Sequence, residues 1–304
     1  MTAFKFGIVH APLTPFSNGS IDFDSYGKLL DFHLDNGAEG LAISTHAGES
    51  VSLTVEERKS LLEFTLKHVG GRIPVIAGVS ESGTAIAASL AAHAREAGAS
   101  ALIASVPYYW TPPQSMLVEH FAAIGAAGGL PLFVYNSPSE MGDVEVTTKA
   151  VLGLFDRLPN FAGLIDASLD WQFMIELVSL ARSAKPDFQF ISGTEYMISA
   201  GAIGATGLLS SLSNISPRIV RELYDLCRDE KYEDARSRQL DLAVMCRLFR
   251  GTGVSGLKAA TRFMGRDCGV PRPPLPTLDD ADSRALAENL SAIRSIGAEP
   301  QGWR

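Results

Sequence analysis

The sequence predicts a (β/α)₈ barrel followed by a helical extension at its C-terminal end. Apolar segments with strand character recur about every 30 residues, and each is followed by a stretch with helical periodicity. Eight such repeats follow one another without a break in a chain of 304 residues, 46% of which are hydrophobic. One barrel accommodates this length. We expect the barrel over residues 1–228 and the extension over residues 229–304.

The eight predicted strands are short apolar runs, and the working residues of such a barrel lie where its strands end. The first predicted helix begins after Asp22 and ends at Gly37, and Thr54 and Glu57 have the spacing of a capping box at the start of the second. Three amphipathic segments after residue 229 predict the helices of the extension. The predicted strands cover residues 6–13, 40–44, 73–79, 101–106, 130–136, 161–166, 188–192 and 205–211.

Composition argues against several classes of function. The net charge of −8 and the lack of a Lys/Arg-rich run argue against a nucleic-acid partner. The N-terminus lacks the pattern of a secretory signal, and no apolar run reaches the roughly 18 residues of a membrane span. Three cysteines without a C-x-x-C spacing are typical of a reducing compartment. We therefore expect a cytoplasmic protein that binds neither nucleic acid nor membrane.

Sequence signatures of cofactor sites do not occur in the chain. It has no G-x-G-x-x-G after a strand, no P-loop and no H-E-x-x-H, and its cysteines lack zinc-site spacing. We expect no obligate cofactor and no metal.

Polar residues follow the second predicted strand in the stretch STHAGES. A tight turn at Gly48 would aim the backbone N–H groups of this loop, including that of Ala47, at an anion. An ordinary glycine turn before a helix, with no role in binding, explains the same residues equally well. His46 is a candidate proton carrier, although a loop histidine more often serves as a hydrogen-bonding residue.

Tyrosines follow the fourth strand and end the fifth. Tyr108, Tyr109 and Tyr135 would form a cluster of phenols able to relay protons at adjacent strand ends. Buried tyrosines are also common as core aromatics whose hydroxyl has a partner, so each residue alone leaves both interpretations open.

Taken together, the strand-end motifs resemble one family. The chain contains, in this order, THAGES, IPVIAGV, VPYYWTPP, VYNSPS, GLIDAS, ISGTE and GLKAA. From about Phe6 to Pro276 this series resembles the dihydrodipicolinate synthase and N-acetylneuraminate lyase family of class I aldolases. The resemblance implies a (β/α)₈ barrel with C-terminal helices, a homodimer or homotetramer, and Schiff-base chemistry on pyruvate or a related 2-oxo acid.

Several family positions can be carried over to this chain. The loop whose amides hold the 2-oxo acid carboxylate falls on STHAGES, with its two threonines replaced by His46 and Ala47. The proton-shuttling tyrosine of the fifth strand falls on Tyr135. The tyrosine that reaches across the dimer interface falls on Tyr109. The resemblance therefore implies catalytic roles for His46, Tyr109 and Tyr135, and a ligand-binding role for Ala47 and Gly48.

Two charged positions of the family pattern are changed. The arginine that grips the second substrate's carboxylate falls on Glu140, and the imine-forming lysine falls on Ile165. An imine requires a primary amine, so this resemblance points to a divergent member without the family's nucleophile. Lys149 and Lys258 are poor substitutes, because we expect one on an outer helix and the other in a structural or solvent-facing position.

The remaining polar groups at the strand ends leave two functional hypotheses. Glu140, Ile165, Ser192 and Ser210 are candidate substrate contacts, and Asp166 should point away from the barrel axis if Ile165 points toward it. The first hypothesis is a lyase or hydro-lyase acting on a small 2-oxo or hydroxy acid, with His46 as proton carrier and Tyr135 as acid. The alternative is a catalytically silent relative that binds a small carboxylate or sugar acid as a sensor or regulatory subunit.

Overall fold

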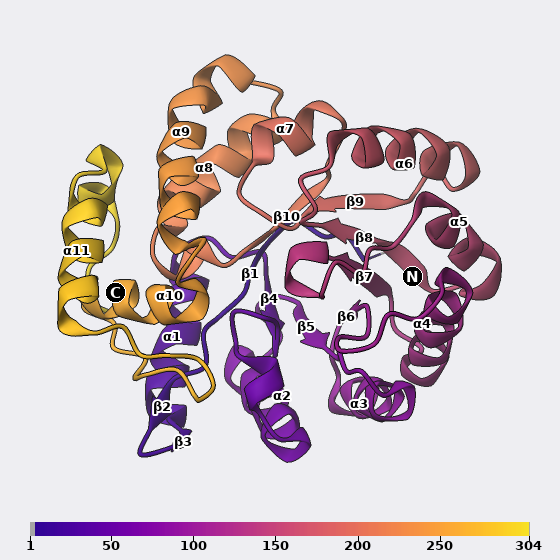
Figure 1. Ribbon diagram of the computed structural model, residues 1–304, viewed down its shortest axis with the longest axis horizontal. Coiled ribbons are helices and arrows are strands. Elements are labelled where there is room, and N and C mark those ends of the chain that lie inside the picture. The colour runs from indigo at the N-terminus through magenta and orange to yellow at the C-terminus, as the bar shows by residue number, and fades with distance from the viewer. Residues whose placement is uncertain (1–3, 304) are drawn as a thin grey trace.

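The computed structural model describes residues 4–303, within which eight parallel strands close a barrel (Figure 1). Around the ring the order is β1, β4, β5, β6, β7, β8, β9 and β10, so that β1 and β7 lie on opposite sides. This confirms the predicted fold class, and each strand lies inside the predicted range. The strands are Ile8–His10, Gly40–Ile43, Val75–Gly78, Ala101–Ser105, Leu132–Asn136, Phe161–Asp166, Gln189–Ser192 and Gly207–Ser210.

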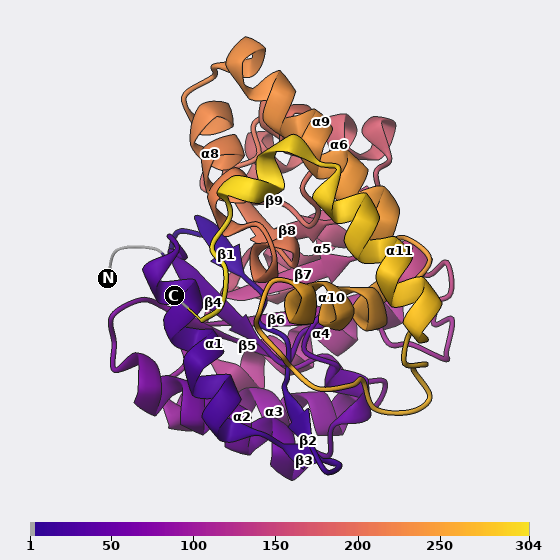
Figure 2. The same ribbon diagram turned by 90° about the vertical axis from the view of Figure 1, so that its left-hand side faces the viewer.

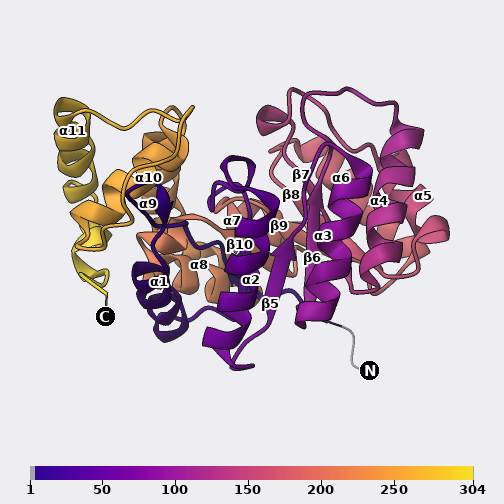
Figure 3. The ribbon, with the colours of Figure 1, turned by 90° about the horizontal axis from the view of Figure 1, so that it is seen from below.

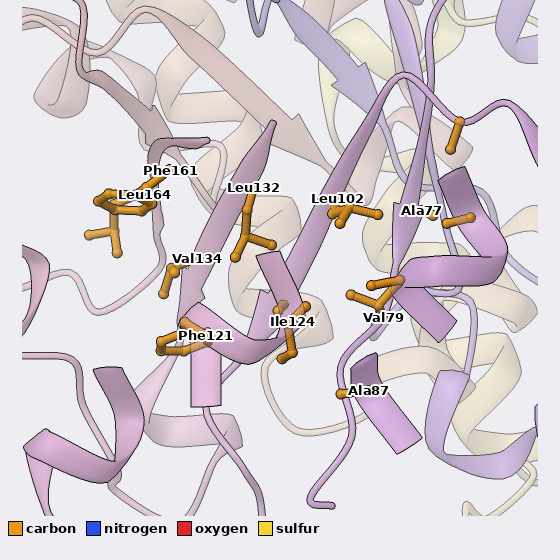
Figure 4. Close-up of a cluster of buried hydrophobic side chains, with 14 of the residues drawn as sticks. Ala77, Val79, Ala87, Leu102, Phe121, Ile124, Leu132, Val134, Phe161 and Leu164 are labelled. Carbon is orange, nitrogen blue, oxygen red and sulfur yellow. The ribbon is translucent and has the colours of Figure 1, made fainter. Parts of the chain in front are cut away.

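Successive strand residues alternate between two apolar layers. Val134 and Leu164 point outward, where they pack beneath the surrounding helices. Phe121 of α4 (Gln114–Gly128) packs in the same layer (Figure 4). Phe133 and Ile165 belong instead to the cluster that fills the barrel interior. A fully buried side chain of this size contributes about 1.5–3 kcal/mol, so both layers stabilise the ring that carries the strand ends.

The helices surround the barrel, and the first two begin at the predicted caps. The Asp22 side chain accepts a hydrogen bond from the amide of Ser25 at the start of α1. Thr54 and Glu57 form the reciprocal capping box of α2. Polar caps satisfy amides that have no partner within the helix. The helices of the barrel are α1 (Phe23–Asp35), α2 (Val55–Val69), α3 (Thr84–Ala97), α4 (Gln114–Gly128), α5 (Thr148–Arg157), α6 (Trp171–Ala184), α7 (Met197–Ala202) and α8 (Pro217–Arg228).

Helices follow the barrel at its C-terminal end, as expected. They are α9 (Tyr232–Phe249), α10 (Gly253–Phe263) and α11 (Asp280–Ser291), and they gather on one side of the molecule (Figures 2 and 3). The buried Arg266 ties this region to the barrel, because its guanidinium donates to the carbonyls of Asn214 and Pro300.

A small hairpin, β2 (Phe16–Ser17) with β3 (Ser20–Ile21), was not apparent from the sequence. Among residues 4–303, no helix has the length and apolar character needed to span a membrane.

Candidate active site

A cavity of about 740 Å³ opens where the barrel strands end. Its lining includes residues that end or follow β4, β5, β6, β7, β9 and β10, together with residues of the C-terminal helices. Gly78 ends β5 beside this cavity, and any side chain there would collide with the carbonyl of Ser44. The glycine therefore lets the loop after β4 pack closely against its neighbour.

Three polar side chains lie in contact with one another in this cavity. Tyr135, on β7, donates to Oε2 of Glu140 over 3.3 Å, and Glu140 Oε1 lies 3.3 Å from Nδ1 of His46. Burial and the nearby Glu140 carboxylate raise the pKa of Tyr135, so its phenol remains protonated near neutral pH. The structure thus brings His46 of the loop after β4 beside Tyr135 and Glu140, which lie in and just after β7.

The loop after β4 contains donors without a partner, and Ser44, Thr45, His46 and Ala47 of this loop line the cavity. Ser44 and Glu49 have left-handed backbone conformations, with φ of 58° and 57°. Among the hydrogen bonds of residues 4–303, none uses the amide N–H of His46, Ala47 or Gly48. The hydroxyls of Ser44 and Thr45 are also buried without a partner in the described part of the chain. Groups of this kind gain the most from an anionic ligand.

A buried ion pair anchors the same loop to α10. Lys258 Nζ lies 2.7 Å from Oε1 of Glu49, with both side chains at most 1% exposed. Lys258 also donates to the carbonyl of Val270 over 3.2 Å, and its ammonium lies 4.2 Å from the ring centroid of Phe16. The amide of Arg272 donates to the second Glu49 oxygen. Lys258 is therefore structural and buried, not solvent-facing.

The inward-facing residue near the end of β8 is Ile165. It is fully buried, it pairs in register with Tyr135 of β7 and Ile191 of β9, and it does not line the cavity. Asp166 points the other way, as expected, and accepts hydrogen bonds from Asn136 at 2.7 Å and from Ser168 at 2.8 Å. Burial raises the pKa of this carboxyl to about 6, although its hydrogen bonds act in the opposite direction.

The other candidate residues lie apart from the cavity. The side chain of Tyr109 is 90% exposed and packs edge-on against Trp110. Ser192 donates to the carbonyl of Thr194 and lines an adjoining cavity of about 190 Å³, which shares Leu169, Thr194 and Tyr196 with the larger one. Ser210 is buried and donates to Glu195 over 2.7 Å. Gly48 has its carbonyl hydrogen-bonded to Thr14 and does not line the cavity, whereas Ala47 does.

Several lining residues were not proposed from the sequence. Glu195 is buried against the cavity, accepts the amide of Leu212 at 3.0 Å, and has its pKa raised by burial. Cys246 and Arg250 come from α9 and the residue after it. The ISGTE motif would have drawn attention to Glu195, whereas no sequence signal connects α9 to the strand ends.

Comparisons with known proteins place the chain in one family. The family model described as Dihydrodipicolinate synthetase family matches residues 5–293. The chain belongs to this family. A 4-hydroxy-tetrahydrodipicolinate synthase from a Thermoanaerobacter species is 32% identical over 293 residues, covering 96% of this chain and 97% of the relative.

Solved structures of the family share the same architecture. Dihydrodipicolinate synthase from Aquifex aeolicus superposes with a TM-score of 0.91 at 30% identity, over 98% of this chain and 99% of that one. A prophage protein of the dihydrodipicolinic acid synthase family from E. coli K12, solved in complex with pyruvate, gives a TM-score of 0.90 at 26% identity, over 95% and 98% of the two chains.

Proposed function

We propose that this family member is a lyase or hydro-lyase that acts on a small 2-oxo or hydroxy acid by acid–base chemistry, without forming an imine. The observation that carries the proposal is the inward-facing Ile165, where the family resemblance places the nucleophilic lysine. Within residues 4–303 the cavity lining contains no lysine. Among residues 4–303, Lys258 is the only buried lysine, and it pairs with Glu49. An imine needs a free amine at the substrate, so a lining without lysine supports a mechanism that forms no imine.

The chain of Tyr135, Glu140 and His46 suits a proton-transfer reaction. In an elimination, the imidazole of His46 takes the proton from the substrate C–H, and the electron pair of that bond forms the double bond. The C–O bond breaks, and the departing oxygen takes the phenolic proton of Tyr135, which releases water. Because both residues contact Glu140, the proton on His46 can return to Tyr135 through this carboxylate. The free amides of the loop after β4 bind the substrate carboxylate.

Replacement of Tyr135 by phenylalanine tests this proposal. Proton NMR in D₂O follows the wild type with a panel of small 2-oxo acids, hydroxy acids and sugar acids. For an acid that reacts, Tyr135→Phe should lower the rate by about 10²–10⁴-fold, because the leaving oxygen loses its proton donor. Tyr224→Phe is the control, since the Tyr224 hydroxyl bonds to the carbonyl of Thr206 away from the cavity.

The same panel separates the two hypotheses from the sequence. A wild type that binds an acid in calorimetry but leaves every acid of the panel unchanged would favour the silent relative, which acts as a sensor or regulatory subunit. A Tyr135→Phe variant with full activity would refute the role given to the phenol.

Association into a homodimer or homotetramer through the region of Tyr109 also remains a proposal. The side chains of Tyr109 and Trp110 are 90% and 62% exposed, although aromatic residues gain by burial. We expect light scattering at micromolar concentration to give at least a dimer, and Tyr109→Ala together with Trp110→Ala to shift it toward monomer. A monomeric wild type would contradict the proposal.

A further inference from the structure

Glu195 is a buried carboxyl in the cavity wall, and its two oxygens have different surroundings. It lies in the loop after β9 and is 5% exposed. Oε1 accepts the hydroxyl of Ser210 over 2.7 Å and the amide of Leu212 over 3.0 Å. Oε2 contacts only the Sγ of Cys246, at 3.8 Å, among the hydrogen bonds of residues 4–303. A thiol is a weak hydrogen-bonding partner, so Oε2 is available to a ligand in the cavity.

The hydrogen bonds of Oε1 determine where a proton on Glu195 lies. Ser210 Oγ accepts the amide of Ser213 over 3.1 Å, so its own hydrogen is directed to Oε1. Together with the Leu212 amide, this gives Oε1 two donors and fills both of its acceptor positions. A proton on this carboxyl therefore lies on Oε2, the oxygen that has no strong partner.

The surroundings of Glu195 favour its neutral form. Among residues 4–303, no Lys, Arg or His forms an ion pair with this carboxyl. From the neighbouring elements, Tyr135 of β7 and Cys246 of α9 are in electrostatic contact with it, while Glu140 acts on Tyr135 and the exposed Arg250 acts on Cys246. Burial of a carboxylate without a cation disfavours its charged form and raises the pKa of Glu195. A neutral carboxyl can donate a hydrogen bond, which an ionised one cannot.

The loop that carries Glu195 packs on the end of β8. Gly193 donates its amide to the Asp166 carbonyl over 2.7 Å, and a side chain at Gly193 would collide with that carbonyl. Asp166 follows Ile165, which pairs in register with Tyr135. Glu195 is also close enough to Tyr135 to contribute to the raised pKa of the phenol. Tyr135 and Glu195 thus provide two donors in the same part of the cavity.

We infer that Glu195 donates a hydrogen bond from Oε2 to the carbonyl oxygen of a bound 2-oxo acid and stabilises the enolate that forms there. This inference rests on the proposed function, in which His46 takes a proton from the substrate C–H. The electron pair of that bond then forms a carbon–carbon double bond, and the π electrons of the carbonyl move onto its oxygen. Imine chemistry would place these electrons on a nitrogen, whereas here the oxygen carries them. Glu195 keeps its proton throughout, and the carbonyl forms again when the C–O bond breaks.

Deuterium exchange isolates this step. Proton NMR in D₂O follows the loss of the C3 protons of pyruvate and 2-oxobutyrate, which requires an enolate but no leaving group. Glu195→Met, which has no donor, should slow the exchange about 10²–10³-fold. Glu195→Gln should remain within about tenfold of the wild type, because its amide oxygen accepts the bonds made to Oε1 and its N–H replaces the donor at Oε2. Glu299→Gln is the control, because Glu299 is a buried carboxyl that accepts two backbone amides and does not line the cavity.

The pH profile of the exchange distinguishes a donor from a residue that only supports the loop. Wild-type exchange should persist while Glu195 is protonated and should fall as the pH rises through its raised pKa, because the ionised carboxylate cannot donate and repels the enolate. Glu195→Gln should lack this fall, whereas Glu299→Gln should retain it. The same fall in Glu195→Gln as in the wild type overturns the inference.

The other outcomes separate this inference from the proposed function. Exchange in a folded Glu195→Met that is as fast as in the wild type overturns the role of Glu195 and leaves those of Tyr135 and His46 in place. A loss in Glu195→Gln as large as in Glu195→Met also overturns it, because the residue would then act as an anion or a base. A wild type that exchanges neither acid overturns the inference, whereas the proposed function falls only if no acid of the larger panel reacts. Thermal unfolding without ligand verifies that each variant is folded, and if Glu195→Met does not fold, the pH profiles decide.

Discussion

Lys258→Ala is expected to lower the free energy of unfolding by about 3–5 kcal/mol, the effect typical of removing one partner of a buried ion pair. The variant leaves the Glu49 carboxylate buried without its cation, and it leaves the Val270 carbonyl without a donor. Burial lowers the pKa of Lys258, and the neighbouring Glu49 carboxylate acts in the opposite direction. The destabilisation therefore reflects the uncompensated charge and not a large net gain from the pair. Denaturation in urea measures it.

A surface pair of the same residue types provides the control. Lys59 Nζ lies 2.9 Å from Glu56 on α2, with the Glu56 side chain 80% exposed. Lys59→Ala should cost less than about 1 kcal/mol, because water screens exposed pairs. The double change Lys258→Met with Glu49→Gln should lower the free energy of unfolding by less than the sum of the two single changes, because no charge then remains buried. If Lys258→Ala and Lys59→Ala lowered the free energy of unfolding equally, burial would not explain the effect of Lys258→Ala.

Regular features of the fold were predictable because they depend on local patterns. The strands follow short apolar runs, and the caps at Asp22 and Thr54 depend on residues three positions apart. The alternation along β8 also predicted correctly that Ile165 and Asp166 face opposite sides. Each of these inferences uses spacing within one segment, and the sequence displays such spacing directly.

The composition of the cavity depends on tertiary contacts that no local pattern specifies. Periodicity shows that α9 has an apolar face, but it does not reveal that Cys246 and Arg250 reach the strand ends. Ser192 and Ser210 follow the expected strands, yet their hydroxyls bond to Thr194 and Glu195. Short polar side chains often satisfy nearby groups in this way, so their position in sequence alone does not make them ligand contacts.

Incubation of the wild type with pyruvate and borohydride is expected to leave its mass unchanged. Borohydride converts an imine into a stable amine adduct, and an imine forms only where a lysine reaches the bound oxo acid. Ile165 occupies the inward position of β8, Lys149 lies on the outer helix α5, and Lys258 is paired with Glu49. Intact-protein mass spectrometry decides the matter, and an adduct mapped to either lysine would restore ordinary imine chemistry.

The reverse substitution, Ile165→Lys, is expected to create the adduct that the wild type lacks. The new amine would start among Phe133, Ile191 and the other apolar side chains of the barrel interior, beside Tyr135, and would extend toward the cavity above. Burial should lower its pKa and so increase the fraction of neutral, nucleophilic amine. Lys149→Arg in the same background is the control, and it should leave the adduct in place.

Trapping of pyruvate by a folded variant would mean that the carboxylate site survives and that one residue separates this chain from imine chemistry. A folded variant that traps no pyruvate would instead show that the cavity accepts a different ligand, and the proposed binding of small 2-oxo acids would then have to be abandoned.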